Sequence, residues 1–343
     1  MASAIDPGLP SLDLRRLDGG QADRGAFLRD LRDAARDVGF FYLAGHGVSD
    51  SLVASVLDES RRFFAQPEAE KLSVAMIHSP HFRGYTRAGQ ELTRGRPDWR
   101  EQFDIHAERE PIAQGPDTQP WTRLQGPNLW PAGQPSLRGV LLTWQATLTV
   151  VAIRLVEAFA EALGQPPGIL APIYDGAPHQ SMKIIRYPGQ TGDSDQGVGA
   201  HKDGGLLTLL LQDKVGGLQV QHGDRWIDAA PRPGTFVVNI GELLELASNG
   251  YLRATVHRVV SPPPGSERLS VAFFLSARLD ATVPLLKLAA ELAGEATGPA
   301  SDPENPLFRS VGQNHLKGRL RSHADVAQRH YADLLSASGQ LDQ

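Results

Sequence analysis

Two histidines and one aspartate in this chain have the residue types and spacing of a metal site. His201 and Asp203 stand two positions apart, and His257 follows further along the chain. On a strand, side chains at positions i and i+2 point to the same side, so His201 and Asp203 can share one interior. Two imidazoles and one carboxylate leave coordination positions open, as in non-haem Fe(II) sites that react with oxygen. We therefore predict that these three residues bind the metal and are catalytic.

Arg268 and Ser270 form a second pair with this spacing, and Phe274 continues the same strand face. A guanidinium presents a planar fork of donors that matches a carboxylate, so the pair is a predicted receptor for a carboxylate co-substrate. Taken singly, each residue has an ordinary interpretation: a surface His-x-Asp pair, a core histidine, or a strand-edge arginine. Their order and spacing, however, fit one pocket.

The composition limits the class of protein. The chain has 343 residues and no cysteine, so disulfides and thiolate metal sites are excluded, and a metal must use His, Asp or Glu. The formal net charge is −5 and no basic block stands out, which predicts no nucleic-acid partner. The first residues resemble no signal peptide, and no run of about eighteen apolar residues occurs. We expect a cytoplasmic protein without a membrane span, and a monomer.

The predicted elements that position these residues are mainly helices before residue 181 and mainly strands after it. An amphipathic helix is predicted over 23–38, a buried strand over 40–43, and a second helix after the cap residue Ser49. A long amphipathic helix is predicted over 135–163, where its apolar stripe would support a sheet. From Ser181 onward, short strands and turns predict an antiparallel jelly-roll barrel; the main segments are 182–187, 206–211, 218–227, 236–240, 251–260 and 268–277. A final helix is predicted at about 325–335.

The predicted fold class is mainly β with flanking helices. Its centre is a double-stranded β-helix (jelly-roll) core, with an N-terminal α/β cap and a long buttressing helix. The corresponding boundaries are 1–125 for the cap region, 126–180 for the helix, 181–280 for the core and 281–343 for a C-terminal extension. His315, His323 and His330 lie in this extension without a metal-binding spacing.

Residues 181–278 resemble the catalytic core of the isopenicillin N synthase-like superfamily of Fe(II)/2-oxoglutarate-dependent oxygenases. Beyond the triad, the resemblance rests on the segments Ile185–Pro188, Gly216–Val220, Trp226, Asn239–Glu242 and Ser248–Gly250. The segments Val38–Tyr42 and Gly45–Val48 resemble the N-terminal cap of the same family. The tail from Asn305 to Arg321 is similar to that of bacterial members.

The resemblance implies a function and a set of site residues. His201, Asp203 and His257 match the iron ligands, Arg268 and Ser270 match the pair that holds the distal carboxylate of 2-oxoglutarate, and Tyr187 matches a residue that lines the same pocket. Fe(II), 2-oxoglutarate and O₂ would be required. The enzyme would hydroxylate, desaturate or cyclise a small molecule, an amino acid or an intermediate of secondary metabolism, and would release succinate and CO₂.

Six residues are candidates for substrate binding: Arg83, Tyr85, Glu91, Thr93, Lys183 and Phe274. The loop from Gly89 to Asp98 is similar to a stretch of bacterial ethylene-forming enzymes in which an acidic and a Thr side chain contact an arginine co-substrate. Glu91 and Thr93 fall on those positions, whereas Gly204 stands where those enzymes have a tyrosine, which argues against arginine. For Arg83, Glu91 and Lys183, the alternative is a solvated or structural charge.

Three other functions stay open at this point. An oxidase of the isopenicillin N synthase type, which uses no 2-oxoglutarate, also carries the Arg-x-Ser pair. A barrel without enzymatic activity could bind metal and ligand, and a zinc hydrolase could use the same three ligands. The hydrolase would need a general base, for which no residue stands out, and it would leave Arg268 unexplained.

Overall fold

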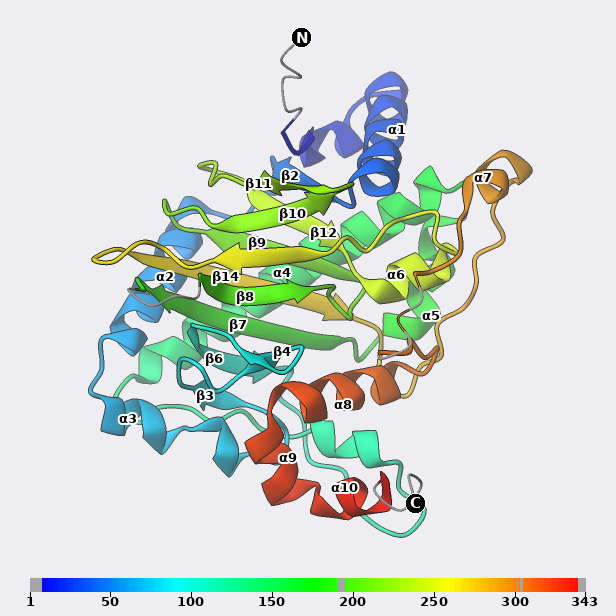
Figure 1. Ribbon diagram of the computed structural model, residues 1–343. Helices are drawn as coiled ribbons and strands as arrows, with labels where there is room; N and C mark the ends of the chain where they lie inside the picture. Colours follow the sequence, from blue (N-terminus) through cyan, green and yellow to red (C-terminus); the bar gives the residue numbers. More distant parts are fainter. Residues whose placement is uncertain (1–7, 191–194, 301, 303–304, 339–343) are drawn as a thin grey trace.

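Figure 1 shows the fold, a computed structural model in which residues 8–190, 195–300, 302 and 305–338 are described. The prediction that no signal peptide is present rested on the first residues of the chain. Of these, residues 1–7 lie outside the described residues. The helices are α1 (Gln21–Asp37), α2 (Asp50–Phe64), α3 (Glu68–Ser73), α4 (Pro135–Ala162), α5 (Ala171–Tyr174), α6 (Glu242–Ala247), α7 (Ala290–Glu295), α8 (Val311–Ser322), α9 (Ala324–His330) and α10 (Ala332–Ser338). The strands are β1 (Ser11–Asp13), β2 (Phe40–Ala44), β3 (Gly84–Thr86), β4 (Leu92–Thr93), β5 (Arg96–Pro97), β6 (Glu101–His106), β7 (His179–Pro188), β8 (Gln196–His201), β9 (Leu207–Gln212), β10 (Leu218–His222), β11 (Arg225–Asp228), β12 (Phe236–Ile240), β13 (His257–Val260) and β14 (Glu267–Ser276).

Two sheets form the core of the molecule. The large sheet has eight strands in the order β1-β2-β12-β9-β14-β7-β6-β3, and the small sheet has four in the order β11-β10-β13-β8. Neighbouring strands are antiparallel in both sheets, except for the parallel pair β1 and β2. An apolar cluster contains residues of both sheets, among them Ile185 and Ala272 from the large sheet and Val198, Val220 and Val259 from the small one. The predicted jelly-roll core is confirmed.

Helix α4 supports the face of the large sheet that is turned away from the small sheet (Figure 1). Its buried stripe includes Trp144 and Phe159, whose rings lie 5.8 Å from Phe236 and 6.4 Å from Phe41 of the sheet. Truncation of such a buried aromatic side chain typically costs about 3–5 kcal/mol of stability. By length and composition alone, α4 could also cross a membrane, a candidate span that the sequence analysis did not expect. Its apolar stripe here packs on the sheet.

Three segments differ from the sequence-based prediction. Strand β8 ends at His201, so Asp203 lies in the turn that follows and not on the strand. Only His257–Val260 of the predicted strand 251–260 pairs with neighbours. The final helix is divided at Tyr331, because this fully buried side chain anchors the chain by donating a hydrogen bond from its hydroxyl to the carbonyl of Pro80 at 2.6 Å. Tertiary packing thus overrides helix propensity at this position.

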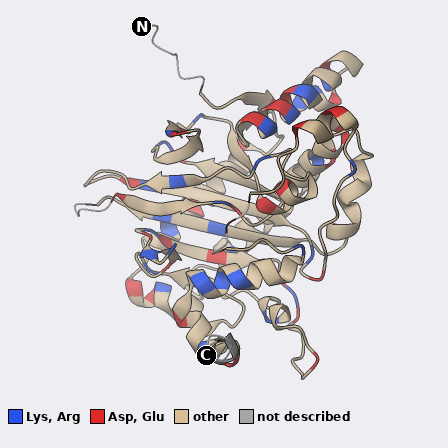
Figure 2. Cartoon of the chain, turned by 45° about the vertical axis from the view of Figure 1, so that its right-hand side comes forward, with Lys and Arg blue, Asp and Glu red and all other residues tan. Residues whose placement is uncertain are grey.

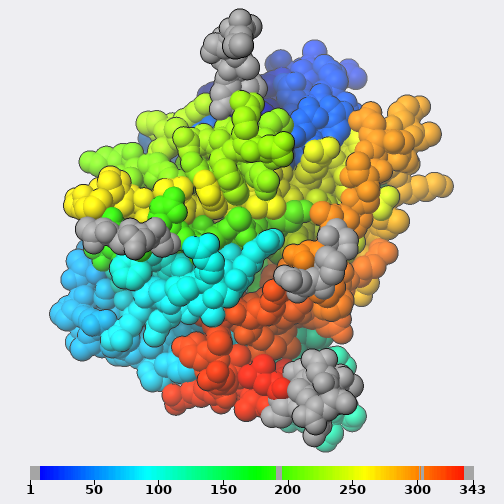
Figure 3. All heavy atoms as spheres, viewed as in Figure 1, coloured from blue at the N-terminus to red at the C-terminus, as the bar shows by residue number. Residues whose placement is uncertain are grey.

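The two ends of the chain join the core. Strands β1, β2, β3 and β6 come from the first 125 residues and extend the large sheet on both sides, so the cap region is part of the same sheet as the core. Helix α8, which the sequence analysis did not predict, lies beside the β4–β5 hairpin, and Figure 3 shows this C-terminal part in contact with the segment around residues 80–110. The division of the chain at 125, 180 and 280 stays a prediction.

Candidate active site

The three predicted metal ligands lie together at one end of the small sheet. His257 begins β13, and its Cα is the partner of His201 on β8, which brings the ring centroids to 4.3 Å. Asp203 Oδ1 lies 3.5 Å from His201 Nε2 and 3.7 Å from His257 Nε2. One ligand atom from each residue lies within 4.8 Å of the others. This spacing suits donors that share one ion at about 2 Å from each.

Backbone carbonyls orient both imidazoles. Nδ1 of His201 lies 2.8 Å from the carbonyl oxygen of Gly199, and Nδ1 of His257 lies 3.1 Å from that of Thr255. Because a carbonyl can only accept, Nδ1 carries the proton in each ring, and Nε2 presents its lone pair to the site. Such outer hydrogen bonds fix the orientation and tautomer of histidines that bind metals.

The carboxylate is held in the same way by two residues that the sequence analysis missed. Asp203 Oδ2 accepts hydrogen bonds from Thr208 Oγ1 at 2.6 Å and from Asn239 Nδ2 at 2.9 Å, which leaves Oδ1 for a metal. Both partners are buried polar residues within largely apolar strands, β9 and β12. That contrast is the sequence signal that could have identified them, since buried polar groups require hydrogen-bond partners.

The local charges favour a metal-binding protonation state for Asp203 and His257. At His201, burial is outweighed by Asp203 and the Gly199 carbonyl, which raise the pKa. Burial alone would raise the pKa of Asp203, but the two imidazoles and the Thr208 hydroxyl hold this pKa well below its usual value. Burial, assisted by the neighbouring His201, lowers the pKa of His257 to about 4. The carboxylate is therefore ionised and His257 is neutral at pH 7, as metal ligation requires.

Arg268 on β14 is a fully buried cation with neutral hydrogen-bond partners. Its guanidinium donates to Ser270 Oγ at 3.2 Å and to Gln212 Oε1 at 3.0 Å, and it lies 4.8 Å from the ring centre of Tyr187. Strand register assembles this group, because Tyr187 is the cross-strand partner of Arg268, and Gln212 is that of Ser270. Gln212 was not predicted.

This guanidinium has the environment of an anion receptor. Among the described residues, no carboxylate lies within ion-pair distance of Arg268, and its Nε has no hydrogen-bond partner. Burial of an uncompensated charge costs several kcal/mol, so the site favours a bound anion. The donor set of the triad and this buried cation therefore fit an iron ion together with a dicarboxylate.

The comparisons with known proteins agree with this chemistry. Residues 9–133 match the family model of the non-haem dioxygenase N-terminal region in morphine synthesis, and residues 178–277 match that of the 2OG-Fe(II) oxygenase superfamily. The 2-oxoglutarate-dependent dioxygenase frbJ of Dothideomycetidae sp. (strain 11243) is 34% identical, over 96% of this chain and 94% of its own length. The chain belongs to the 2OG-Fe(II) oxygenase superfamily.

Two further relatives of this oxygenase are informative. Homoarginine-6-hydroxylase 2-ODD-233 of Oryza sativa subsp. japonica is 38% identical, over 77% of this chain and 81% of its own length. The crystal structure of a full-length Neurospora crassa protein in complex with alpha-KG, which is 2-oxoglutarate, superposes with a TM-score of 0.73 at 27% identity, and covers 90% of this chain and 96% of that one. Of the functions that the sequence left open, the comparisons select the 2-oxoglutarate-dependent enzyme.

The oxygenase requires Fe(II), 2-oxoglutarate and O₂, and it hydroxylates a small molecule. When bound, the iron and its co-substrates supply the oxidising chemistry and yield succinate and CO₂. The protein's own residues orient the metal donors, and Arg268 offers a fixed cation to a carboxylate.

A cavity of about 540 Å³ opens beside the metal ligands. Four of the six predicted substrate-binding residues line this cavity together with His201 and Asp203; they are Glu91, Thr93, Lys183 and Phe274. The structure thus brings these four to the metal site, although they come from β4, the loop before it, β7 and β14.

Glu91 already has partners within the protein. Its carboxylate lies 2.9 Å from Lys183 Nζ and 2.7 Å from Arg100 Nη2, and all three side chains are at most 10% exposed. Burial would raise the pKa of Glu91, but these two cations hold it well below its usual value. The structure thus favours the structural interpretation of Glu91 and Lys183 as a buried ion-pair network in the wall of the cavity.

The prediction for Arg83 is corrected by the structure. This side chain does not line the metal cavity and instead lines a second cavity of about 320 Å³. Its guanidinium donates to the carbonyls of Ala107 and Leu124 and to Asn128 Oδ1, at 3.0 to 3.2 Å. Arg83 therefore ties together the segments after β6, and burial lowers its pKa to about 9.

The prediction for Tyr85 is also wrong, because this residue does not line the metal cavity. It lies on β3, at the edge of the large sheet, where its ring packs 6.0 Å from Phe63 of α2. The hydroxyl donates to Glu101 Oε2 at 2.5 Å, and Glu101 also contacts Lys71. This side chain thus belongs to the helix-covered face of the sheet.

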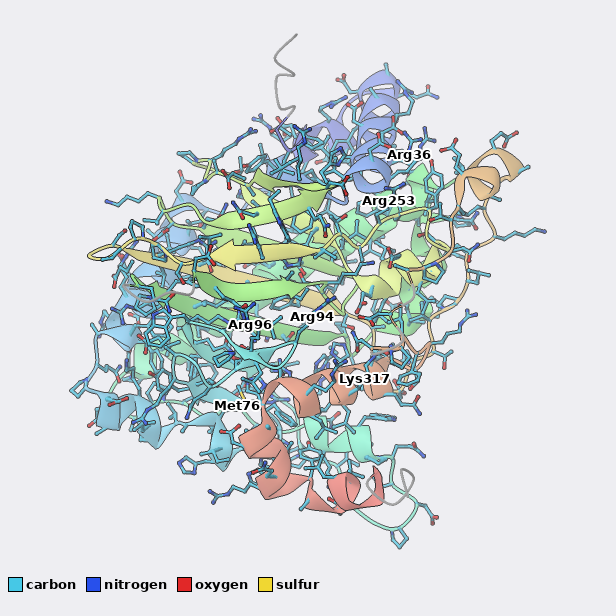
Figure 4. All side chains as sticks on the ribbon, viewed as in Figure 1. Arg36, Met76, Arg94, Arg96, Arg253 and Lys317 are labelled. Atoms are coloured by element: carbon cyan, nitrogen blue, oxygen red, sulfur yellow. The ribbon has the colours of Figure 1, made fainter. Side chains whose placement is uncertain are left out.

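Helix α8 supplies the part of the cavity that sequence reasoning missed. His315, Lys317, Arg319 and Arg321 all line the cavity, and Figure 2 shows the basic residues along this helix. Arg319 anchors the helix by contacting Asp104 Oδ1 at 3.0 Å. Figure 4 shows Lys317 on this side and Arg94 on the β4–β5 hairpin. The sequence shows the alternation of basic residues at 317, 319 and 321. It does not show that these residues lie beside the metal ligands.

Proposed function

We propose that this oxygenase hydroxylates a free amino acid with a cationic side chain. The observation that carries the proposal is the mixture of charges beside the metal ligands: the wall of the cavity contains four carboxylates and seven lysines or arginines. A zwitterion with an additional charge needs receptors of both signs in a site that excludes water. The relatives named homoarginine-6-hydroxylases support this class of substrate.

The residues around the cavity suggest how such a substrate would be held. The basic side chains of α8 line the cavity and would exchange some of their present contacts for a substrate carboxylate, and Phe274 offers an apolar wall to the aliphatic part. Burial in the cavity would place a carbon of the side chain next to the open positions of the metal. Fixed positioning of this kind, relative to the reacting group, is the main contribution of the protein chain to the reaction.

The test measures succinate formed per 2-oxoglutarate consumed, with L-homoarginine, L-arginine and L-lysine as substrates. We expect at least one of them to raise 2-oxoglutarate consumption above the substrate-free rate and to gain one oxygen atom, detected by mass spectrometry. The Asp203→Ala variant is the matched control, because it retains the cavity but lacks the metal carboxylate. A neutral or purely anionic compound that alone stimulates turnover would contradict the proposed substrate class.

The remaining expectations concern the setting of the protein. We propose that it acts as a cytoplasmic monomer, without nucleic-acid or membrane partners. The net charge of −5 supports this, as does the packing of the apolar α4 against the sheet. Light scattering coupled to size-exclusion chromatography would show a mass of about 37.1 kDa for the monomer, and sedimentation with lipid vesicles would test membrane binding. The bacterial origin indicated by the tail stays a prediction.

A further inference from the structure

The carboxylates of the cavity differ in whether the protein itself neutralises them. Four line the cavity, namely Glu91, Asp203, Glu242 and Asp302. Glu91 is held by two buried cations, Asp203 belongs to the metal triad, and Asp302 lies 3.8 Å from Arg94. Glu242 is different: among the described residues, its carboxylate has no hydrogen bond and no ion pair, and charged groups act on it only at longer range.

Glu242 is the first residue of α6 and is half-buried beside the metal ligands. Its backbone N–H donates to the carbonyl of Asp203 at 2.8 Å, which ties the start of the helix to the metal-binding turn. The carboxylate is directed toward Gly204, since a Cβ placed there would lie 3.9 Å from Glu242 Oε2. Because residue 204 has no side chain, nothing at this position separates the carboxylate from the cavity.

The nearest lysines do not neutralise Glu242 by contact. Lys202 forms its ion pair with Glu245 at 3.2 Å, and it acts on Glu242 only at longer range. Lys317 on α8 donates to the carbonyl of Pro306, and it acts on Glu242 only at longer range. Among the described residues, Glu242 thus presents to the cavity a carboxylate that has no contacting donor, and a bound cation would be its first direct partner.

We propose that Glu242 binds the side-chain cation of the substrate, a guanidinium or an ammonium group. This inference rests on the proposed function, because it assigns the charge receptor of that same cavity. In a hydroxylation at the carbon that carries the guanidino group, as the names of the homoarginine-6-hydroxylases describe, the cation must bind next to the metal. Glu242 contacts the turn that contains Asp203 and therefore has the required position. Glu91, whose oxygens are already bound by Lys183 and Arg100, has a structural role instead.

The experiment compares ligands of equal shape and different charge. L-homoarginine is paired with L-homocitrulline, and L-arginine with L-citrulline, in which a neutral ureido group replaces the guanidinium. Dissociation constants are measured anaerobically by calorimetry on protein loaded with Fe(II) and 2-oxoglutarate, so binding is separated from turnover. We expect the wild-type protein to bind at least one cationic amino acid about 10- to 100-fold more tightly than its neutral counterpart, since a hydrogen bond to a charged group has that magnitude.

Two variants of the cavity then distinguish the receptors. Glu242→Gln should lose most of the preference for the cationic amino acid, while its affinity for 2-oxoglutarate is unchanged. Glu91→Gln should unfold at a lower temperature but retain the preference. Gly204→Leu, which covers the carboxylate without removing it, serves as a further variant and should weaken binding of the cationic amino acid selectively. Glu291→Gln, on the exposed surface of α7, is the matched control and should behave as wild type.

The outcomes separate this inference from the proposed function. A Glu242→Gln variant that keeps the preference, or a preference lost in Glu91→Gln instead, overturns the assignment of Glu242. A wild-type protein that binds neither cationic amino acid more tightly than its neutral counterpart overturns it as well. The proposed function fails on a different measurement, namely the absence of succinate formation with every cationic amino acid.

Discussion

The two sides of the cavity are held in place by different kinds of interaction. On the metal side, β8, β13 and the turn after β8 carry the ligands, and neutral groups such as Thr208 and Asn239 orient them. On the opposite side, the β4–β5 hairpin and α8 come from distant parts of the chain, and the charged side chains Glu91, Lys183 and Arg319 hold the wall together. Strand register positions the first side, and long-range ion pairs position the second.

This difference separates chemistry from recognition within one site. Rigid strands hold reacting groups more accurately than loops do, so the metal side can be the same for many substrates. Loops and terminal segments tolerate change, so specificity can vary on the other side without disturbing the metal. The following substitutions test whether the two sides can be separated in this way.

The largest effect is expected from loss of a metal ligand. His257→Ala should abolish turnover and iron binding while the fold persists, because the metal side does not support the charged wall. Asn239→Ala, which removes only an orienting hydrogen bond, should lower iron affinity about 10- to 100-fold. Iron content and circular dichroism of both purified variants check this. Equal losses in the two variants would show that Asn239 does more than orient the ligand.

A large loss of stability is expected on the charged wall. Lys183→Met should cost about 3 kcal/mol, the low end for breaking a buried ion pair, because Arg100 still contacts Glu91. Urea unfolding measures the change, and iron binding by the folded variant should remain. The double variant Glu91→Gln/Lys183→Met should recover part of the loss, since the buried Glu91 charge is then removed together with its cation and Arg100 still lies 3.6 Å from Asp98. An unchanged midpoint for Lys183→Met would contradict a structural role for this network.

A smaller, selective effect is expected from Arg268. Arg268→Ala should weaken 2-oxoglutarate binding about 10- to 100-fold, the magnitude of a lost hydrogen bond between charged groups, without loss of iron. The anaerobic absorption band of the iron–2-oxoglutarate chelate, titrated with 2-oxoglutarate, measures this affinity. If half-saturation needs the same concentration as in wild type, the co-substrate carboxylate is bound elsewhere.

The smallest effect concerns the pH dependence of stability on the α8 side. Burial, partly offset by Glu91, lowers the pKa of His323 to about 4, from 6.5 in the unfolded chain. Between these values the unfolded state binds more protons, so stability falls with decreasing pH by about 1.4 kcal/mol per pH unit, and the loss is complete below about pH 4. Urea unfolding at pH 7 and 5.5 should show a shallower pH dependence for His323→Gln than for wild type. Identical slopes would mean that His323 does not titrate as described.

Several features of the site could be predicted from the sequence because they depend on local rules. The spacing of His201 and Asp203 and that of Arg268 and Ser270 indicated shared faces, although Asp203 reaches its place from a turn. Tyr85 was a candidate for substrate binding, but the sequence does not tell which face of its strand is covered by helices. For Arg83, the contacts that decide its orientation come from the segments after β6.

The sequence by itself therefore determined the chemistry of this protein: the donor types, their order along the chain and the pair that can receive a carboxylate. Only the tertiary structure decided which charges are already neutralised and which face the substrate. Lys183 and Glu91 are 92 positions apart, and Arg319 and Asp104 are 215 apart. Metal ligation is specified by residue type and short-range geometry, whereas the availability of a charge depends on partners that only folding brings within reach.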